Sequence, residues 1–413
     1  MATWENEGLI TPGDPKAADQ VLDRFEAAEE YGIQVENQHP GKLTLGEYLL
    51  TLGHEVCNKR PRLFGTGYEE TADSIGFQAA CLAMGLPLAG MENLHKHMNE
   101  LFYKQASGVS QPPHYIEDPK NGFWAGILQA ADFWEEVLAA TRWDKAGHSV
   151  PHGSLVSTAM VVAALVEASS NTDKAQGSWA RPAHWPRSKN ANKVPTIALR
   201  RYIMALLSPE LTRQYGKIQD LVWADGTDAA GQRIPSRWFF TEPTKGQLSV
   251  FDSWWSTQLQ KGMGRNVSSL QKTLLAVVTK MVQPERGIPY GKKEVDHVIS
   301  WSQVAQQNWQ SSHPVSSVAN LCILDKQTNG ALKSAGSLNS LLSHPDIVGR
   351  NEDNAKRRAM IESNVFLSDQ KLRKTLLELD ATIDSDSIES EAAFSEFLNL
   401  RWEAIKGHLI GSR

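Results

Sequence analysis

The chain has 413 residues, of which 41% are hydrophobic and 22% are charged, and its formal net charge is −5. This composition is typical of a folded globular protein and excludes a disordered or fibrous chain. Because the net charge is negative, no overall positive field draws the chain to a polyanion, and contact with nucleic acid would depend on local basic patches.

The length predicts two or three domains. The cysteines Cys57, Cys81 and Cys322 have no paired spacing, which argues against a disulfide framework or a thiolate zinc site and favours a reducing cytoplasm. Residues 1–7 lack the basic and apolar regions of a secretory signal. The longest apolar stretch, Leu155–Val166, is shorter than the ~20 residues of a membrane span, so we expect a buried helix and no membrane insertion.

The first region, expected to span residues 1–280, shows helical spacing with frequent breaks. We predict helices at 73–84, 91–102 and 123–140, separated by clusters of Gly, Pro and Asn. Further helices are expected at 197–207, at 211–223 and, with interruptions, at 250–282. Tryptophans at helical spacing are core residues far more often than parts of a cofactor site, so Trp238, Trp254 and Trp255 are assigned to packing.

A basic stretch, residues 174–201, lies inside this region. It contains no acidic residue, and Trp179 and Trp185 lie among its cations, which are Lys174, Arg181, Arg187, Lys189, Lys193, Arg200 and Arg201. One interpretation is a loop that binds phosphates while its aromatics stack on bases. The other is a solvated linker. Under the first interpretation, the residues that contact DNA are Arg181, Arg187, Lys189 and Lys193.

After Pro284 the pattern changes to short mixed segments, and after Ala331 it becomes helical again as far as His408. Residues 281–345 are therefore expected to form a separate module, and residues 346–413 a helical extension. Within the module, 294–299 and 317–324 are apolar and β-branched enough to be strands, and 328–333 is able to start a helix.

Polar residues in this module have the types that phosphodiester cleavage requires. The reaction needs a base to activate water, a cation to take up charge, and a rigid frame. His297 is suited to accept the proton because an imidazole titrates near neutral pH. Asp296 precedes it on a strand, so the two side chains point to opposite faces unless the backbone bends.

The Asp296-His297 pair, Asn320 at the second strand and Asn329 nine positions later resemble the HNH (ββα-metal) nuclease pattern in its Asp-His…Asn…Asn form. The resemblance implies a mainly α chain with a small ββα-metal module, α+β overall. It implies that Asp296 and Asn329 bind one Mg²⁺ or Mn²⁺, that His297 is the base and that Asn320 braces the loop holding it. Lys333 would then hold a phosphate oxygen.

Taken singly, each of these residues has an ordinary structural interpretation. An Asp-His pair is common by chance, a lone His is more often a satisfied core or surface residue, and Asn329-Gly330 alone indicates a turn. Their joint order within strand-like and helix-like segments favours the nuclease.

The resemblance extends over about residues 285–410, including the runs 318–329 and Phe394–Trp402, to the C-terminal half of GmrSD-type restriction nucleases, which act in bacterial defence. The chain lacks their Asp-Gly-Gln-Gln-Arg motif and any Walker-type loop. Control of cleavage by a nucleotide is therefore in doubt. Residues 1–280 are expected to carry a different sensor, a docking surface or an autoinhibitory segment that covers the active site. The layout is also similar to the HNH component of a Zorya-like system, with other defence proteins as partners.

The sequence thus predicts a cytoplasmic, Mg²⁺-dependent endonuclease that nicks DNA. One alternative is an RNA-cleaving toxin with the same site, which the absence of an RRM or KH signature disfavours. The other is a catalytically silent DNA-binding or scaffold subunit, against which the intact set of Asp296, His297, Asn320 and Asn329 argues.

Overall fold

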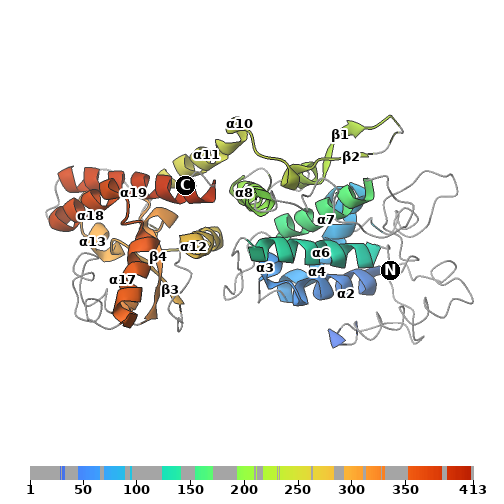
Figure 1. Cartoon of the computed structure of the whole chain (residues 1–413), viewed down its shortest axis with the longest axis horizontal. Helices are drawn as coiled ribbons and strands as arrows, with labels where there is room; N and C mark the ends of the chain where they lie inside the picture. Colours follow the sequence, from blue (N-terminus) through green and yellow to red (C-terminus); the bar gives the residue numbers. More distant parts are fainter. Residues whose placement is uncertain are drawn as a thin grey trace, which may run out of the picture. The chain divides into compact units, whose positions relative to one another are not determined.

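The structure is a computed structural model of the whole chain (Figure 1). The residues that it describes are 28, 30–32, 45–65, 69–88, 94, 123–140, 154–170, 193–208, 211, 217–229, 231, 233–261, 264–282, 293–309, 313–326, 328–330, 352–383 and 388–410.

The chain divides into two compact units, Met1–Pro243 and Thr244–Arg413. This boundary lies before the expected one at residue 280. The second unit therefore includes three described helices whose residues were expected in the first region, α10 (Lys245–Leu248), α11 (Val250–Leu259) and α12 (Ser269–Val282), and α12 packs against elements of the predicted nuclease module.

The first unit is mainly helical. Its described elements are α2 (Leu45–Asn58), α3 (Pro61–Phe64), α4 (Glu69–Met84), α6 (Phe123–Ala140), α7 (Ser154–Ser170), α8 (Lys193–Leu207), η2 (Lys217–Leu221), β1 (Trp223–Thr227), β2 (Arg233–Pro235) and η3 (Trp238–Phe240).

Two glycines allow α2 and α4 to pack closely. A Cβ atom on Gly53 would lie 2.1 Å from the carbonyl oxygen of Ala72, and one on Gly76 would lie 1.9 Å from that of Leu49. Since real Cβ atoms do not approach an oxygen so closely, any larger residue would push the helices apart. The pair of glycines thus sets the separation of α2 and α4.

The apolar stretch Leu155–Val166 forms most of α7, and its residues from Val156 onward are buried in the core of the unit. The expectation of a buried helix is confirmed. Among the described residues, no helix combines the length and apolarity that a membrane crossing requires.

The prediction of a helix at 211–223 is wrong for its described C-terminal part, residues 217–223. There the chain forms the short 3₁₀ turn η2 and then enters β1, which pairs with β2 in an antiparallel hairpin. Gly226 and Gly231 adopt φ values of 88° and 74°, which end helical structure and suit a hairpin. The indole Nε1 of Trp223 donates to the carbonyl oxygen of Leu82 at 2.7 Å and fixes the hairpin to α4.

The second unit combines helices with one strand pair. Its described elements are α10 (Lys245–Leu248), α11 (Val250–Leu259), α12 (Ser269–Val282), β3 (Lys293–His297), α13 (Trp301–Ala305), η4 (Val318–Asn320), β4 (Leu321–Asp325), α17 (Glu352–Val365), α18 (Gln370–Thr382) and α19 (Ile388–Leu409).

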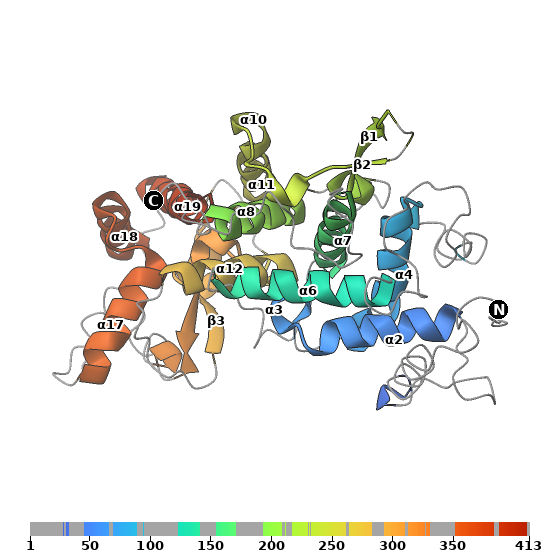
Figure 2. The ribbon, with the colours of Figure 1, turned by 45° about the vertical axis from the view of Figure 1, so that its right-hand side comes forward.

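Strands β3 and β4 form an antiparallel pair in which Asp296 lies opposite Cys322 and His297 opposite Leu321. All five residues of β4 are buried, because α12, α17 and α19 pack against it or against the η4 turn that precedes it (Figures 1 and 2). Trp254 and Trp255 of α11 contact the fully buried Trp402 of α19, with ring centroids 5.2 Å apart in each pair. The helices thus form a rigid support behind one strand of the pair.

The expectation of a mainly α chain with a small β component is confirmed, since the described residues are mostly helical and contain two two-stranded antiparallel sheets. The predicted helices at 73–84, 123–140 and 197–207 lie within α4, α6 and α8. The expected packing of Trp254 and Trp255 is also confirmed. Most of the helix expected at 91–102 lies outside the described residues.

Candidate active site

The Asp-His pair lies at the C-terminal end of β3, where the backbone bends at residues 298 and 299. The backbone N–H of His297 donates to Oδ1 of Asp296 at 2.8 Å, and the same oxygen lies 3.8 Å from Nδ1 of the imidazole. The two side chains are 16% and 23% exposed for His297 and Asp296 respectively. The carboxylate and the imidazole therefore lie side by side, within reach of solvent, although consecutive strand residues normally point apart.

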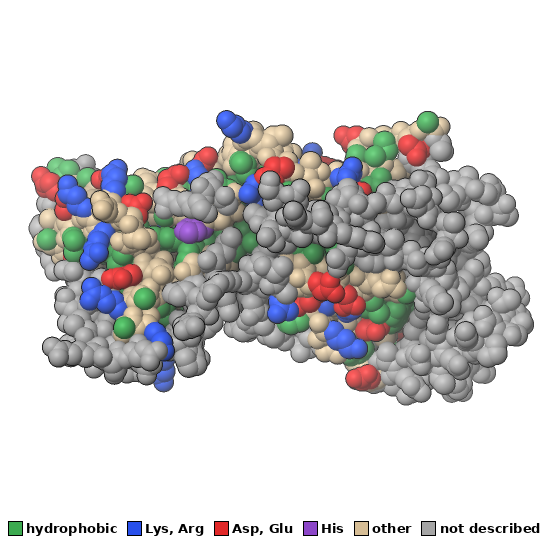
Figure 3. Space-filling view, in the orientation of Figure 1, with side chains coloured by type: hydrophobic (Ala, Val, Ile, Leu, Met, Phe, Trp, Pro, Cys, Tyr) green, Lys and Arg blue, Asp and Glu red, His purple; other side chains and the backbone are tan. Residues whose placement is uncertain are grey.

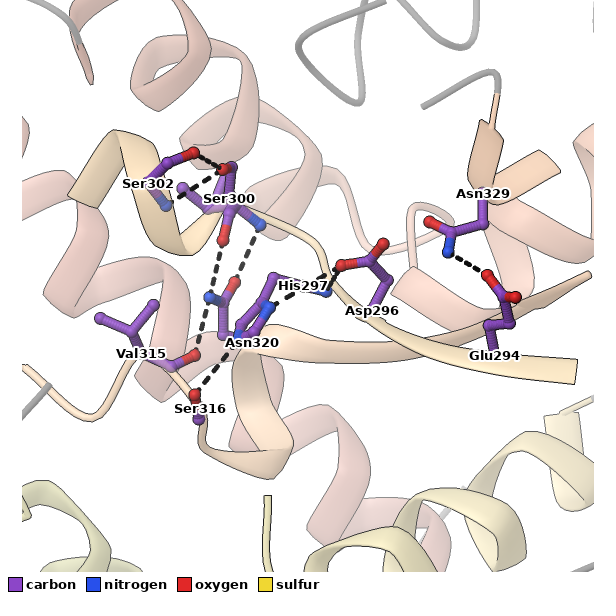
Figure 4. Close-up of polar contacts among 10 residues, drawn as sticks. Glu294, Asp296, His297, Ser300, Ser302, Val315, Ser316, Asn320 and Asn329 are labelled. Carbon is purple, nitrogen blue, oxygen red and sulfur yellow. Dashed lines mark hydrogen bonds and ion pairs between the residues drawn. The ribbon is translucent and has the colours of Figure 1, made fainter. Parts of the chain in front are cut away.

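Asn320 is fully buried and holds the backbone on both sides of the pair. Its side-chain Oδ1 accepts from Ile299 N at 2.9 Å, and its Nδ2 donates to the carbonyl oxygens of Ile299 and Val315, each at 2.9 Å (Figure 4). Its own carbonyl oxygen accepts from Val298 N at 2.7 Å. Asn320 thereby fixes the bend after His297 and joins it to the loop at 315–317.

That loop contacts the imidazole through Ser316, whose Oγ lies 3.1 Å from His297 Nε2. If Nε2 carries the proton and donates it to Ser316, Nδ1 is the unprotonated nitrogen, and it is the nitrogen that lies near Asp296. The loop that Asn320 braces thus also orients the ring of His297.

Glu294 and Asn329 form the other part of the site. Asn329 is 3% exposed, and its Nδ2 donates to Oε2 of Glu294 at 2.6 Å. A carboxylate accepts and does not donate, so the amide must present its NH₂ group to Glu294 and its oxygen in the other direction. That oxygen, Oδ1, is buried and accepts no hydrogen bond from the described part of the chain.

Glu294 and Asp296 are two positions apart on β3 and therefore lie on the same face, about 7 Å apart along the strand. In Figure 4 the side chain of Asp296 lies between His297 and Asn329. Asp296 and His297 thus lie at the C-terminal end of β3, whereas Glu294 and Asn329 lie toward its N-terminal end, where β4 ends.

The thiol of Cys322, opposite Asp296 on β4, takes no part in this group. Burial raises its pKa from 9.0 to about 12, and the negative charge of Asp296 adds to the increase. The thiol is protonated at neutral pH, which excludes it as a nucleophile or a ready metal ligand.

Several predicted site residues lie outside the described residues. These are Lys333, Arg181, Arg187 and Lys189; Lys193 begins α8, but its side chain is not described. Their roles stay predictions. On the face drawn in Figure 3, the described Lys and Arg side chains of each unit lie among Asp and Glu side chains, as the small net charge suggests.

The sequence analysis gave no role to Glu294 or Ser316. The signal for Glu294 was present, because a residue two positions before Asp296 on a strand shares its face. Ser316 had no such signal, since its contact with His297 spans 19 positions and depends on how the intervening loop folds.

Among the described residues, no cluster of three or more His, Cys, Asp or Glu side chains is close enough to hold a metal ion. The polar side chains along β3 are a group of a different kind, because the oxygen that has no hydrogen-bond partner among the described residues comes from an amide. Mg²⁺ binds through one or two carboxylates together with substrate phosphates and water, and does not need a complete protein cage. The buried Oδ1 of Asn329, which accepts no hydrogen bond from the described residues, is the kind of hard oxygen that such a cation takes as a ligand.

No protein-family model matches the chain, and no similar protein was found among the curated proteins or the solved structures.

Proposed function

We propose that this chain is a metal-dependent endonuclease of the HNH type that hydrolyses phosphodiester bonds in DNA. The observation that carries the proposal is the side chain of Asn329, which donates to Glu294, two positions before Asp296 on β3, and keeps a buried oxygen that accepts no hydrogen bond from the described residues. A buried acceptor without a donor costs about 1–3 kcal/mol, which a bound cation would offset.

In the proposed reaction, His297 accepts a proton from water through Nδ1 while Nε2–H donates to Ser316 Oγ. The nearby carboxylate of Asp296 stabilises the imidazolium that results. Asn320 keeps the imidazole in place because it fixes the backbone on both sides of the ring.

Asp296 and Asn329 are the residues that would hold Mg²⁺ or Mn²⁺, with Glu294 orienting Asn329. When bound, the cation would polarise a phosphoryl oxygen and take up charge on the leaving oxygen. The helical backbone at 328–330 follows β4, and with β3 and β4 it supplies the two strands and the start of a helix expected of an HNH module, while α13 and η4 lie in the connection between the strands.

The preference for DNA follows from the basic stretch 174–201 and the absence of an RNA-binding motif in the sequence. One base and one cation site act on one strand, so we expect nicks. The resemblance to GmrSD-type nucleases makes defence against foreign DNA the expected setting.

The test is incubation of the purified chain with supercoiled plasmid and with RNA, each in Mg²⁺, Mn²⁺ or EDTA. We expect relaxed circles in either metal and none in EDTA. Cleavage of RNA alone would indicate the toxin. DNA binding without cleavage in any metal would indicate a binding or scaffold subunit.

A further inference from the structure

Arg401 of α19 places a charged side chain behind the candidate site. Its guanidinium group is fully buried. Nη1 donates to the carbonyl oxygen of Ala319 at 2.8 Å, and Nη2 donates to those of Leu321 at 2.6 Å and Asn364 at 3.0 Å. Among the described residues, its hydrogen bonds are all to backbone carbonyl oxygens, and none is to a carboxylate.

Such a burial is not explained by stability alone. Taking a cation out of water is expensive, and replacing a buried charge by an apolar side chain of similar size is often neutral or stabilising. Burial lowers the pKa of Arg401 from 12.5 to about 10, so the group is still charged at neutral pH. A fully buried charge with three hydrogen bonds to the backbone therefore points to a role in geometry.

The carbonyl groups of Ala319 and Leu321, which accept from Arg401 and lie next to the candidate site in the chain, show which part of the backbone Arg401 holds. The carbonyl of Ala319 belongs to the peptide that leads into Asn320, and the carbonyl of Leu321 to the peptide that follows the next residue, so the guanidinium fork holds the backbone just before Asn320 and one residue after it. Asn320 in turn bonds the backbone at Ile299 and Val315. The contacts run from α19 through Asn320 to the bend after His297 and to the loop that carries Ser316.

We propose that Arg401 is a positioning residue for His297, acting through Asn320. The inference rests on the proposed function for its catalytic consequence. Lysine cannot replace arginine in this role, because a single ammonium nitrogen does not reproduce the planar fork that bonds the carbonyl oxygens of 319 and 321 together.

The test compares Arg401→Lys and Arg401→Met with two controls in the same unit. Arg358→Lys changes a half-buried arginine that pairs with Glu362. Leu376→Ala removes buried apolar volume from α18. It therefore lowers the melting temperature by a change in a helix that does not contain Asn320 or Arg401. Each variant is measured for its melting temperature, its kcat and KM on plasmid, and the ¹⁵N chemical shifts of His297, which report its tautomer.

We expect both Arg401 variants to lose about 10²-fold in kcat, because small displacements of a catalytic group have effects of that size. KM should change little, and the His297 tautomer signals should change. Leu376→Ala should keep kcat and the signals at an equal or greater loss of melting temperature. Arg358→Lys should match wild type.

Wild-type kcat in a folded Arg401→Lys or Arg401→Met variant would overturn the inference. Unfolding of both Arg401 variants would also overturn it, because Arg401 would then be needed only for the stability of the fold. If the wild type cuts no nucleic acid, the proposed function fails, and the His297 signals still decide the inference: unchanged signals in a folded Arg401 variant reject it, and altered signals support it.

Discussion

The side-chain amide of Asn320 makes a reciprocal pair of hydrogen bonds with the backbone of Ile299, 21 positions earlier, with both N···O distances at 2.9 Å. The pairing uses the donor and the acceptor of the amide together. These two hydrogen bonds fix the backbone just after His297, and they come from a residue that immediately precedes the partner strand β4. The orientation of the imidazole therefore depends on a residue with which it shares no hydrogen bond among the described residues.

Replacing Asn320 by Ala should therefore affect both stability and catalysis. It leaves the N–H and the carbonyl of Ile299 and the carbonyl of Val315 without these partners, and each unsatisfied buried group costs about 1–3 kcal/mol. We expect a loss of about 3 kcal/mol in the unfolding free energy, measured in urea, and a fall in kcat. Asn320→Asp should also be destabilising, since a carboxylate cannot donate to the two carbonyl groups.

The matched control is Asn399→Ala. Asn399 is an exposed residue of α19 that accepts one hydrogen bond from Trp255 Nε1. It should change the unfolding free energy by about 1 kcal/mol or less. Equal losses of unfolding free energy in Asn320→Ala and Asn399→Ala would show that the hydrogen bonds between Asn320 and Ile299 do not stabilise the bend after His297.

The cation requirement should depend on the oxygen ligands and on Glu294. Asp296→Ala and Asn329→Ala each remove a proposed ligand, and we expect both to raise the Mg²⁺ concentration at half-maximal cleavage. Glu294→Gln removes the charge beside Asn329 and keeps the shape of the side chain, and residues that orient a ligand typically affect metal affinity 10–100-fold. The measurement is a Mg²⁺ titration of the cleavage rate.

Glu396→Gln is the control for this titration, because Glu396 is a half-exposed residue of α19 that pairs with Lys371. It should titrate like wild type. If the Asp296 and Asn329 variants also titrate like wild type, the cation binds elsewhere.

Alkaline pH should lower the unfolding free energy of the first unit, because the buried thiol of Cys81 loses its proton more easily in the unfolded chain. Burial raises the pKa of its thiol from 9.0 to about 11, so the stabilisation is complete below pH 9 and is lost as the pH rises through 11. Between pH 8 and 10.5, the wild type should lose about 2 kcal/mol more unfolding free energy than Cys81→Ala. Parallel curves for the two proteins would show that this thiol is not buried in the native state.

The basic stretch supports a prediction about DNA affinity. If Arg181, Arg187, Lys189 and Lys193 contact phosphates, replacing all four by Ala should weaken binding to every sequence and reduce the slope of log K against log salt by up to about four contacts. Sequence preference should hardly change, because phosphates carry no base information. A solvated linker predicts wild-type affinity and an unchanged slope.

The helices of the chain were predictable where their apolar residues recur at helical spacing, as in α6, or form a continuous apolar run, as in α7. The hairpin of β1 and β2 was not predicted, because Trp223 and the leucines before it also fit a helical period. Gly226 and Gly231 decide the outcome through their positive φ values, which a hydrophobic pattern does not report.

The site was predictable only where its members are close in sequence or in a known order. Asp296, His297, Asn320 and Asn329 follow a pattern of residue types and spacings. The contact of Ser316 with His297 spans 19 positions and those of Arg401 with Ala319 and Leu321 span 82 and 80, and they depend on how a loop and α19 pack against β3 and β4. Tertiary packing of this kind leaves no local signal in one sequence.

The most direct test of the account is the rate of plasmid nicking by His297→Ala at saturating Mg²⁺. The side chain of His297 is 16% exposed and its hydrogen bond among the described residues is to Ser316, so its removal should leave folding and DNA binding close to wild type. Loss of a general base should reduce the rate about 10²–10⁴-fold. A folded His297→Ala protein that nicks plasmid within a few-fold of the wild-type rate would contradict the account.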